Sequence, residues 1–231
     1  MVDRKTQRIS ALKVQRKDPN RVSVYLDGAF AFGLDRLVAA WLHPDQELSQ
    51  EQITELREKD TFARARSAAL RLLNARPRSE KELQSRLAAK GFDEACIEHT
   101  LSSLKDQGLV GDESFAKEWV ENRATFRPRG RRLLAQELRQ KGVADETVRQ
   151  TLEELEPEEE LAFRAAQAHL PRVPAGDWPS FREKMGAYLV RRGFSYAVAS
   201  LTARRIWGEE AEATRTNQDF PEDNRHVENT H

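Results

Sequence analysis

Alternating apolar and polar positions mark the start of the chain as β structure. Apolar side chains occupy every second position over residues 22–26, and the alternation resumes over 30–32 after an Asp27-Gly28 pair. Asp-Gly favours a two-residue hairpin turn, because both turn positions need a positive φ. An earlier apolar stretch, residues 9–14, can pair alongside. The pattern therefore predicts a small antiparallel meander.

Two short helical segments follow the meander. Residues 35–42 have helical spacing and end before Pro44. Ser49, with Gln52 three positions later, forms a capping-box signature for the start of a second short helix.

From about residue 60 to residue 207 the apolar spacing is helical, and it repeats three times with a period of 51 residues. Turn residues and apolar helix positions keep this spacing without a gap, which predicts three tandem units. The matching positions are Gly91, Gly142 and Gly193; Pro77, Pro128 and Pro179; Leu87, Leu138 and Leu189; and Leu83, Leu134 and Met185.

Each unit is expected to contain three helices. First helices are predicted over 61–75, 112–125 and 158–170, and each ends at a turn that contains proline. Second helices are predicted to begin near Ser79, Gly130 and Phe181, and to end at a basic residue followed by a left-handed glycine. Third helices are predicted to be capped by Asp93, Asp145 and Ser195.

These elements predict a mainly α protein made of three tandem three-helix repeats in an elongated solenoid. A unit of about fifty residues buries too little surface to be stable alone, so neighbouring units should share their faces. We expect a basic segment with the β-hairpin and short helices, then the three repeats, then a disordered acidic tail. The predicted boundaries are 1–60, 61–110, 111–156, 157–207 and 208–231.

Composition agrees with several thin helical layers rather than one broad core. Only 39% of the 231 residues are hydrophobic and 33% are charged, against a usual charged fraction of about 25%. The formal net charge is zero, yet basic residues dominate 1–21 and acidic residues dominate 208–231. No apolar run approaches the length of a membrane span, no secretory signal is visible, and Cys96 has no partner for an internal disulfide. We therefore expect a cytoplasmic protein that does not contact the membrane.

Sequence signatures of catalysis are missing. The chain has no phosphate-binding glycine loop, no zinc-protease motif and no nucleophile elbow, and its five histidines are scattered. We therefore expect neither an enzyme nor a bound metal or cofactor.

Basic residues recur at the turn before the second helix of the first two repeats, over 76–79 and 127–132. Cations at a helix N-terminus oppose the helix dipole, so their presence there favours a role in binding phosphates or carboxylates. The alternative is a solvated turn whose arginines pair with nearby acids such as Glu80 or Glu137. The third turn, 178–181, lacks the arginines, so the sequence assigns any such role to the first two repeats.

Several segments resemble the RecX family of regulatory proteins. They are the hairpin over 24–34, residues 78–83 with 90–92, and residues 128–130 with 141–143. The resemblance covers about residues 9–207.

The resemblance implies a modulator of the RecA recombinase that binds RecA–DNA filaments in their helical groove. Such a protein limits filament growth, ATP hydrolysis, strand exchange and coprotease activity, and we expect a monomer that contacts single-stranded or duplex DNA without sequence preference. Carried over by position, the candidates for contacting the partner are Arg76, Arg78, Lys90, Arg127, Arg129, Arg131, Arg132 and Lys141.

Two other functions stay open at this point. The three-helix units are also compatible with a sequence-specific regulator that binds double-stranded DNA through helix-turn-helix units. A scaffold for another protein would explain the repeats but not the hairpin segment.

Overall fold

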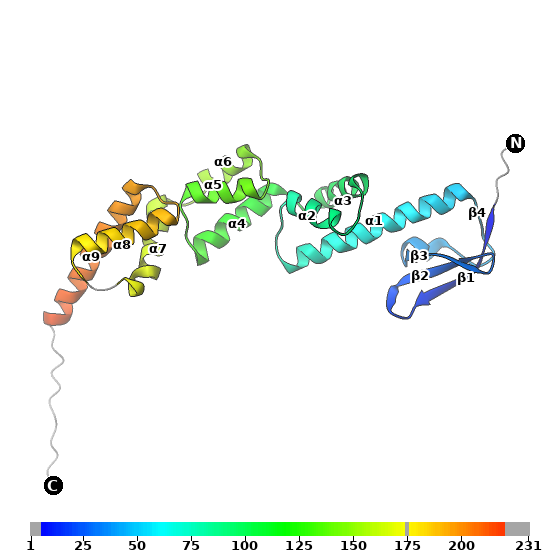
Figure 1. Cartoon of the computed structure of the whole chain (residues 1–231), viewed down its shortest axis with the longest axis horizontal. Helices are drawn as coiled ribbons and strands as arrows, with labels where there is room; N and C mark the ends of the chain where they lie inside the picture. Colours follow the sequence, from blue (N-terminus) through cyan, green and yellow to red (C-terminus); the bar gives the residue numbers. More distant parts are fainter. Residues whose placement is uncertain (1–5, 174–175, 220–231) are drawn as a thin grey trace, which may run out of the picture. The chain divides into compact units, whose positions relative to one another are not determined.

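The protein, described here by a computed structural model, is mainly helical with an antiparallel sheet at its N-terminus, as predicted (Figure 1). The structure describes residues 6–173 and 176–219, with side chains up to Glu209. The chain divides into two compact units, residues 1–115 and 116–231, and each is described by itself.

The predicted meander is confirmed and gains a fourth strand. The sheet has the order β3-β2-β1-β4, and its strands are β1 (Gln7–Gln15), β2 (Asp18–Leu26), β3 (Ala29–Asp35) and β4 (Glu47–Leu48). Asp27 and Gly28 both have positive φ, at 51° and 88°, as the hairpin turn requires. The helix predicted over 35–42 is reduced to a single 3-10 turn, η1 (Val38–Trp41).

The first long helix, α1 (Gln50–Ala75), corrects one prediction. The short helix and the first helix of the first repeat, predicted as separate elements, form one continuous helix because no glycine or proline interrupts them. Its start is as predicted: the Ser49 hydroxyl accepts a hydrogen bond from Gln52 N, and the Gln52 side chain accepts one from Ser49 N.

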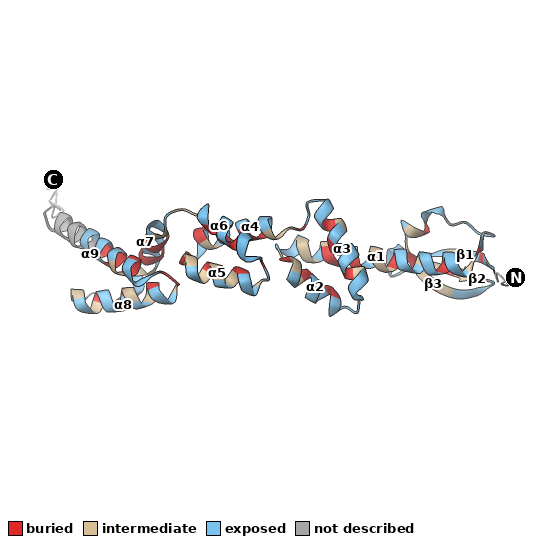
Figure 2. Cartoon of the chain, turned by 90° about the horizontal axis from the view of Figure 1, so that it is seen from above, coloured by how far each residue is buried: buried red, intermediate tan, exposed pale blue. Residues whose placement is uncertain are grey.

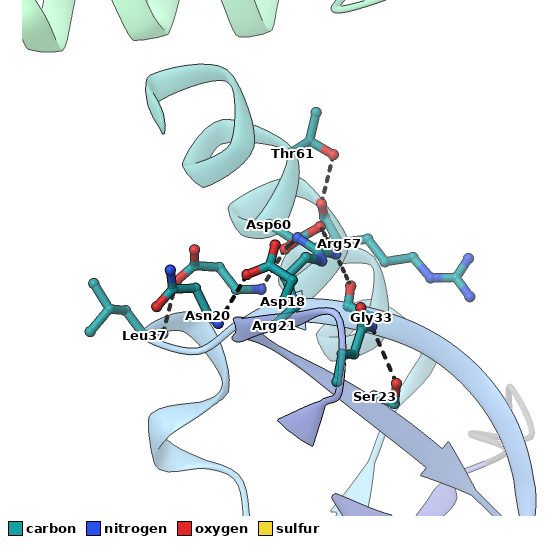
Figure 3. A network of polar contacts seen from close by, with 11 residues as sticks. Asp18, Asn20, Arg21, Ser23, Gly33, Leu37, Arg57, Asp60 and Thr61 are labelled. Carbon is teal, nitrogen blue, oxygen red and sulfur yellow. Dashed lines mark hydrogen bonds and ion pairs between the residues drawn. The ribbon is translucent and has the colours of Figure 1, made fainter. Parts of the chain in front are cut away.

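A buried carboxylate fastens α1 to the sheet (Figure 3). Asp60 is only 5% exposed. Its carboxylate forms an ion pair with Arg21 Nη1 at 3.0 Å and accepts a hydrogen bond from Asp35 N at 2.6 Å. Arg21 Nη2 also donates to the Gly33 carbonyl at 2.9 Å. A charge can be buried at this position because both the carboxylate and the guanidinium have several partners.

Replacing Asp60 with alanine should destabilise the first unit by about 3 kcal/mol, because it leaves the Arg21 guanidinium without its carboxylate. Hydrogen exchange of the β2 and β3 amides measures the loss. The control is Glu58→Ala on the exposed face of α1, which should cost less than about 0.5 kcal/mol. Equal exchange rates in the two variants would contradict the role of Asp60.

Within residues 6–173 and 176–219, eight further helices follow α1 and complete the three repeats. They are α2 (Glu80–Ala88), α3 (Glu94–Asp106), α4 (Asp112–Phe126), α5 (Arg131–Gln140), α6 (Asp145–Glu153), α7 (Glu158–His169), α8 (Trp178–Arg191) and α9 (Tyr196–Asp219). Their buried residues lie where the helices of a repeat face one another (Figure 2). A 3-10 turn, η2 (Leu170–Arg172), follows α7.

Three predicted helix ends shift. The N-cap of α6 is Ala144 rather than Asp145. The helix α8 begins at Trp178, three residues before Phe181, because the Asp177 carboxylate accepts a hydrogen bond from Ser180 N and caps it there. The helix α9 extends to Asp219, past the predicted start of the acidic tail at residue 208. The rest of that predicted tail, 220–231, lies outside the described residues.

The same turn ends the second helix of every repeat, as predicted. Gly91, Gly142 and Gly193 have φ values of 87°, 88° and 91°, a conformation that disfavours a side chain. In each case the next amide donates back to a carbonyl five residues earlier: Phe92 to Leu87 at 3.4 Å, Val143 to Leu138 at 3.1 Å and Phe194 to Leu189 at 3.2 Å. This Schellman geometry places Leu87, Leu138 and Leu189 in the interior, where all three are fully buried.

In the second unit this turn also joins two repeats. Gly130 N, at the start of α5, donates to the Arg192 carbonyl at the end of α8 at 2.9 Å. A Cβ on Gly130 would lie 2.2 Å from the Gly193 carbonyl oxygen. The backbones of the two repeats therefore touch at a place where only glycine fits.

Replacing Gly130 with alanine should force this contact apart and lower the free energy of unfolding of the second unit by about 1–3 kcal/mol. The matched control is Gly186→Ala in α8, where a Cβ meets nothing within 4 Å and the change should raise stability by up to about 1 kcal/mol. Urea unfolding followed by tryptophan fluorescence compares the two variants. A Gly130→Ala variant as stable as the Gly186→Ala variant would show that the contact is not needed.

Candidate basic interface

The arginines of the first turn are engaged inside the first unit. Arg76 and Arg78 both form ion pairs with Glu82. Arg78 is only 11% exposed, and its Nε donates to the Leu72 carbonyl at the end of α1 at 3.0 Å. The acid that pairs with them is Glu82 and not Glu80, which binds Lys105 at 3.0 Å. These contacts give Arg78 an internal role in joining α1 to α2.

The second turn contains both internal and exposed arginines. The Arg131 guanidinium donates to the carbonyls of Leu155 at 2.9 Å and Glu156 at 3.2 Å, so it fastens the start of α5 to the segment after α6. Arg127 and Arg132 are exposed. In the part of the chain that the structure describes, neither guanidinium has a carboxylate partner.

One carboxylate serves several donors at the centre of this turn. The side chain of Glu137 is 12% exposed and forms an ion pair with Arg129. It also accepts from Arg123 Nε at 3.3 Å and from the indole N–H of Trp119 at 2.9 Å. Because a single negative charge is shared between two guanidinium groups, the surrounding surface keeps an excess of positive charge.

Aromatic rings lie close to three cations of this surface. The Arg123 guanidinium lies 4.2 Å from the centre of the Trp119 ring, and Lys141 Nζ lies 5.2 Å from it. The Arg192 guanidinium lies 5.1 Å from the centre of the Tyr188 ring. Such contacts orient a cation over the face of the ring.

The pKa of Arg129 reflects the positive charges that surround it. Burial lowers the pKa of Arg129, and the neighbouring guanidinium groups of Arg123, Arg192 and Arg127 lower it further. We call Arg123, Arg127, Arg129, Lys141 and Arg192 the basic cluster.

The positive field extends to the end of α7. Burial lowers the pKa of His169 below its usual value of 6.5, and the positive charges of Arg172, Arg192 and Arg191 lower it further. The His169 imidazole stacks on the Tyr188 ring, with the ring centres 3.7 Å apart. Arg192 therefore acts on both Arg129 and His169.

The structure brings together only some of the residues that the sequence singled out. Arg127, Arg129 and Lys141 belong to the basic cluster, with Arg132 on the adjoining turn of α5. Arg76, Arg78 and Lys90 lie in the first unit, where Lys90 lines a polar cavity with Arg64 and Arg71.

Arg123 and Arg192 are not among the site residues predicted from the sequence. Nothing in the repeat pattern distinguishes Arg123, whose position depends on Glu137 and Trp119. A signal for Arg192 did exist. Lys90, Lys141 and Arg192 are spaced by the 51-residue period, and each directly precedes the left-handed glycine of its repeat.

Metal-ligating groups are not gathered in the described residues: no three His, Cys, Asp or Glu side chains there converge in a way that could hold an ion. Among the helices that the structure describes, none is long and apolar enough to cross a membrane.

Three family profiles match successive parts of the chain. The RecX N-terminal domain matches residues 7–49, the first RecX three-helix domain matches 65–104 and the second matches 112–152. A regulatory protein RecX from Thermobifida fusca is 37% identical over 165 residues, which cover 71% of this chain and 87% of the relative. The chain belongs to the RecX family.

More distant RecX proteins match over nearly their whole length. A regulatory protein RecX from Clostridium perfringens is 29% identical over 209 residues, covering 88% of this chain and 98% of the relative. A crystal structure of regulatory protein RecX superimposes with a TM-score of 0.65 at 27% identity and covers 85% of this chain and 98% of that one.

Replacing Arg192 with alanine should raise the pKa of His169, because it removes one of the positive charges that disfavour the imidazolium. The value should stay below 6.5, since burial, the largest cause, remains. With a depressed pKa in the folded state, the wild-type protein should also lose stability as the pH falls below about 6.5, because the unfolded chain binds the proton more readily.

An NMR titration of the His169 imidazole measures this shift. Arg149→Ala is the control, since Arg149 is paired with Glu146 and Glu153 on α6 and is not among the groups that shift His169. An unchanged pKa of His169 in the Arg192→Ala variant would show that the charge of Arg192 does not act on His169.

Proposed function

We propose that the protein modulates the RecA recombinase by binding RecA–DNA filaments, and that it lowers their ATPase, strand-exchange and coprotease activities. It acts in the cytoplasm as a monomer without a cofactor and has no catalytic activity of its own. The observation that carries the proposal is the basic cluster of this RecX family member, in which the Arg123 and Arg129 guanidinium groups share the single carboxylate of Glu137.

The chemistry of the cluster suits a filament of protein and DNA. Guanidinium groups bind carboxylates and phosphates through paired hydrogen bonds, so the same surface can contact acidic side chains of the recombinase and the DNA backbone. Contacts of this kind carry no base readout, in keeping with binding that does not depend on DNA sequence. Arg127 and Arg132 are the exposed members of this surface without carboxylate partners in the described chain.

The alternative of a sequence-specific DNA-binding regulator is less well supported by the third helices of the first two repeats. In helix-turn-helix proteins of three helices, the last helix enters the major groove. Here α3 contains Glu94, Glu98 and Asp106 against one basic residue, Lys105. The helix α6 likewise contains Asp145, Glu146 and Glu153 against Arg149. A helix of this charge would be repelled by the phosphates that flank the groove.

We also propose that the chain functions as five successive parts: the β segment, the three repeats and the acidic C-terminus. In support, the three family profiles fall within the first three proposed ranges, 1–60, 61–110 and 111–156. The remaining ranges are 157–207 and 208–231, and α9 crosses the boundary between them.

Changing Arg127, Arg132 and Arg192 together to alanine should weaken inhibition of the RecA ATPase at least tenfold, because three cations without strong carboxylate partners are lost. Arg131 is left unchanged because its contacts are internal. ATP hydrolysis by RecA filaments formed beforehand on single-stranded DNA, titrated with wild-type and variant protein, measures the effect.

The matched control is Arg149→Ala, which also removes an exposed arginine of the second unit, but one already paired with two carboxylates. It should inhibit as well as the wild type. Wild-type inhibition by the triple variant, with an unchanged helical circular-dichroism signal, would remove the basic cluster from the mechanism. No inhibition by the wild type at excess would overturn the RecA proposal itself.

A further inference from the structure

The first unit contains a polar cavity away from the basic cluster. It has a volume of about 470 Å³ and opens between the end of β3, the start of β2, the middle of α1 and the turn after α2. We call it the α1 cavity. Four basic side chains line it, together with two carboxylates, two small polar side chains and a phenylalanine: Arg21, Arg64, Arg71, Lys90, Asp18, Asp35, Asn20, Ser67 and Phe92.

Three of the four cations in the α1 cavity are available to a ligand. Arg64, Arg71 and Lys90 are exposed, and none of them has a carboxylate partner among the described residues. The fourth, Arg21, forms an ion pair with the buried Asp60.

The carboxylates of the cavity are already engaged by the backbone. The Asp18 carboxylate accepts a hydrogen bond from Asn20 N at 3.0 Å, and the Asp35 carboxylate accepts one from Leu37 N at 2.9 Å. Both acids therefore stabilise their own turns. Neither of them forms an ion pair with Arg64, Arg71 or Lys90 in the described residues.

The arrangement of the cations on α1 favours a row of negative charges. Arg64 and Arg71 are two helical turns apart on the same face, which separates their backbones by about 10 Å. Between them lies Ser67, whose hydroxyl accepts a hydrogen bond from Arg71 Nη1 at 3.3 Å. Lys90 approaches from the turn after α2. A single small anion would not engage all three cations as well as linked phosphates, which also match the guanidinium fork.

We propose that the α1 cavity binds linked phosphate groups, either the polyphosphate of a nucleotide or the backbone of single-stranded nucleic acid. Arg64, Arg71 and Lys90 bind the phosphates, and the half-buried Phe92 packs against the attached sugar or base. The site does not depend on the proposed action on RecA, because phosphate binding is measured with the purified protein alone.

Two probes test the site with the full-length chain: ATP, and a short fluorescently labelled oligothymidylate. Arg64→Ala/Arg71→Ala should weaken the affinity for the bound probe at least tenfold. For the oligonucleotide, the slope of log affinity against log salt concentration should also decrease by about 1.4, which corresponds to about 0.7 for each lost phosphate contact. Lys90→Ala provides an independent variant from a different element and should weaken the same probe.

The matched control is Lys59→Ala, an exposed cation on the same helix that is already paired with Glu55, and it should bind as the wild type does. Weakened ATP binding assigns the site to a nucleotide, and weakened binding of the oligonucleotide alone assigns it to the nucleic-acid backbone. The proposal is overturned if wild-type protein binds neither probe, or if the folded double variant binds both as tightly as the wild type does.

Discussion

In every repeat the chain leaves its second helix through one left-handed glycine, and the rest of the repeat depends on this reversal. The glycine allows the following apolar residue to fold back, with its amide bonded to the carbonyl of Leu87, Leu138 or Leu189. Those leucines are thereby held in the interior and the third helix is directed across them. In the second unit the same turn, at Gly193, also meets Gly130 of the neighbouring repeat, so one local conformation shapes both the repeat and the contact between repeats.

The residue before this glycine explains how the helical repeats acquire positive surfaces. It lies at the negative end of a helix, where a cation is favourable, so a basic side chain is tolerated there without loss of stability. The surroundings then differ among the repeats. Lys90 lines the α1 cavity, Lys141 lies over Trp119, and Arg192 adds its charge to those around Arg129. The same structural position thus places a basic side chain in three different surroundings.

Features that depend on neighbours in the sequence were predicted from it. The Asp27-Gly28 hairpin, the left-handed glycines and the cap at Asp93 all follow from the conformational preferences of a few adjacent residues. The ion pair between Arg21 and Asp60 could not be predicted in this way, because it joins residues 39 positions apart and depends on how α1 packs on the sheet.

The candidate site was predictable only in part for the same reason. The sequence located two arginine-rich turns but could not separate Arg127, which is exposed, from Arg131, whose guanidinium binds carbonyls 24 and 25 residues away. The separation depends on tertiary contacts. Of the two alternatives raised by the sequence, the pairing of arginines with a nearby acid is seen at Glu137, and the binding role of the exposed arginines stays a prediction.

Hydrogen–deuterium exchange of the full-length protein, alone and with RecA filaments on single-stranded DNA, tests most directly whether the basic cluster contacts the partner. If the basic cluster contacts the partner, exchange should be slower in the presence of the filament over the turn before α5 and at the end of α8, where Arg127 and Arg192 lie. Protection confined to the acidic third helices α3 and α6, with unchanged exchange around Arg127 and Arg192, would contradict it.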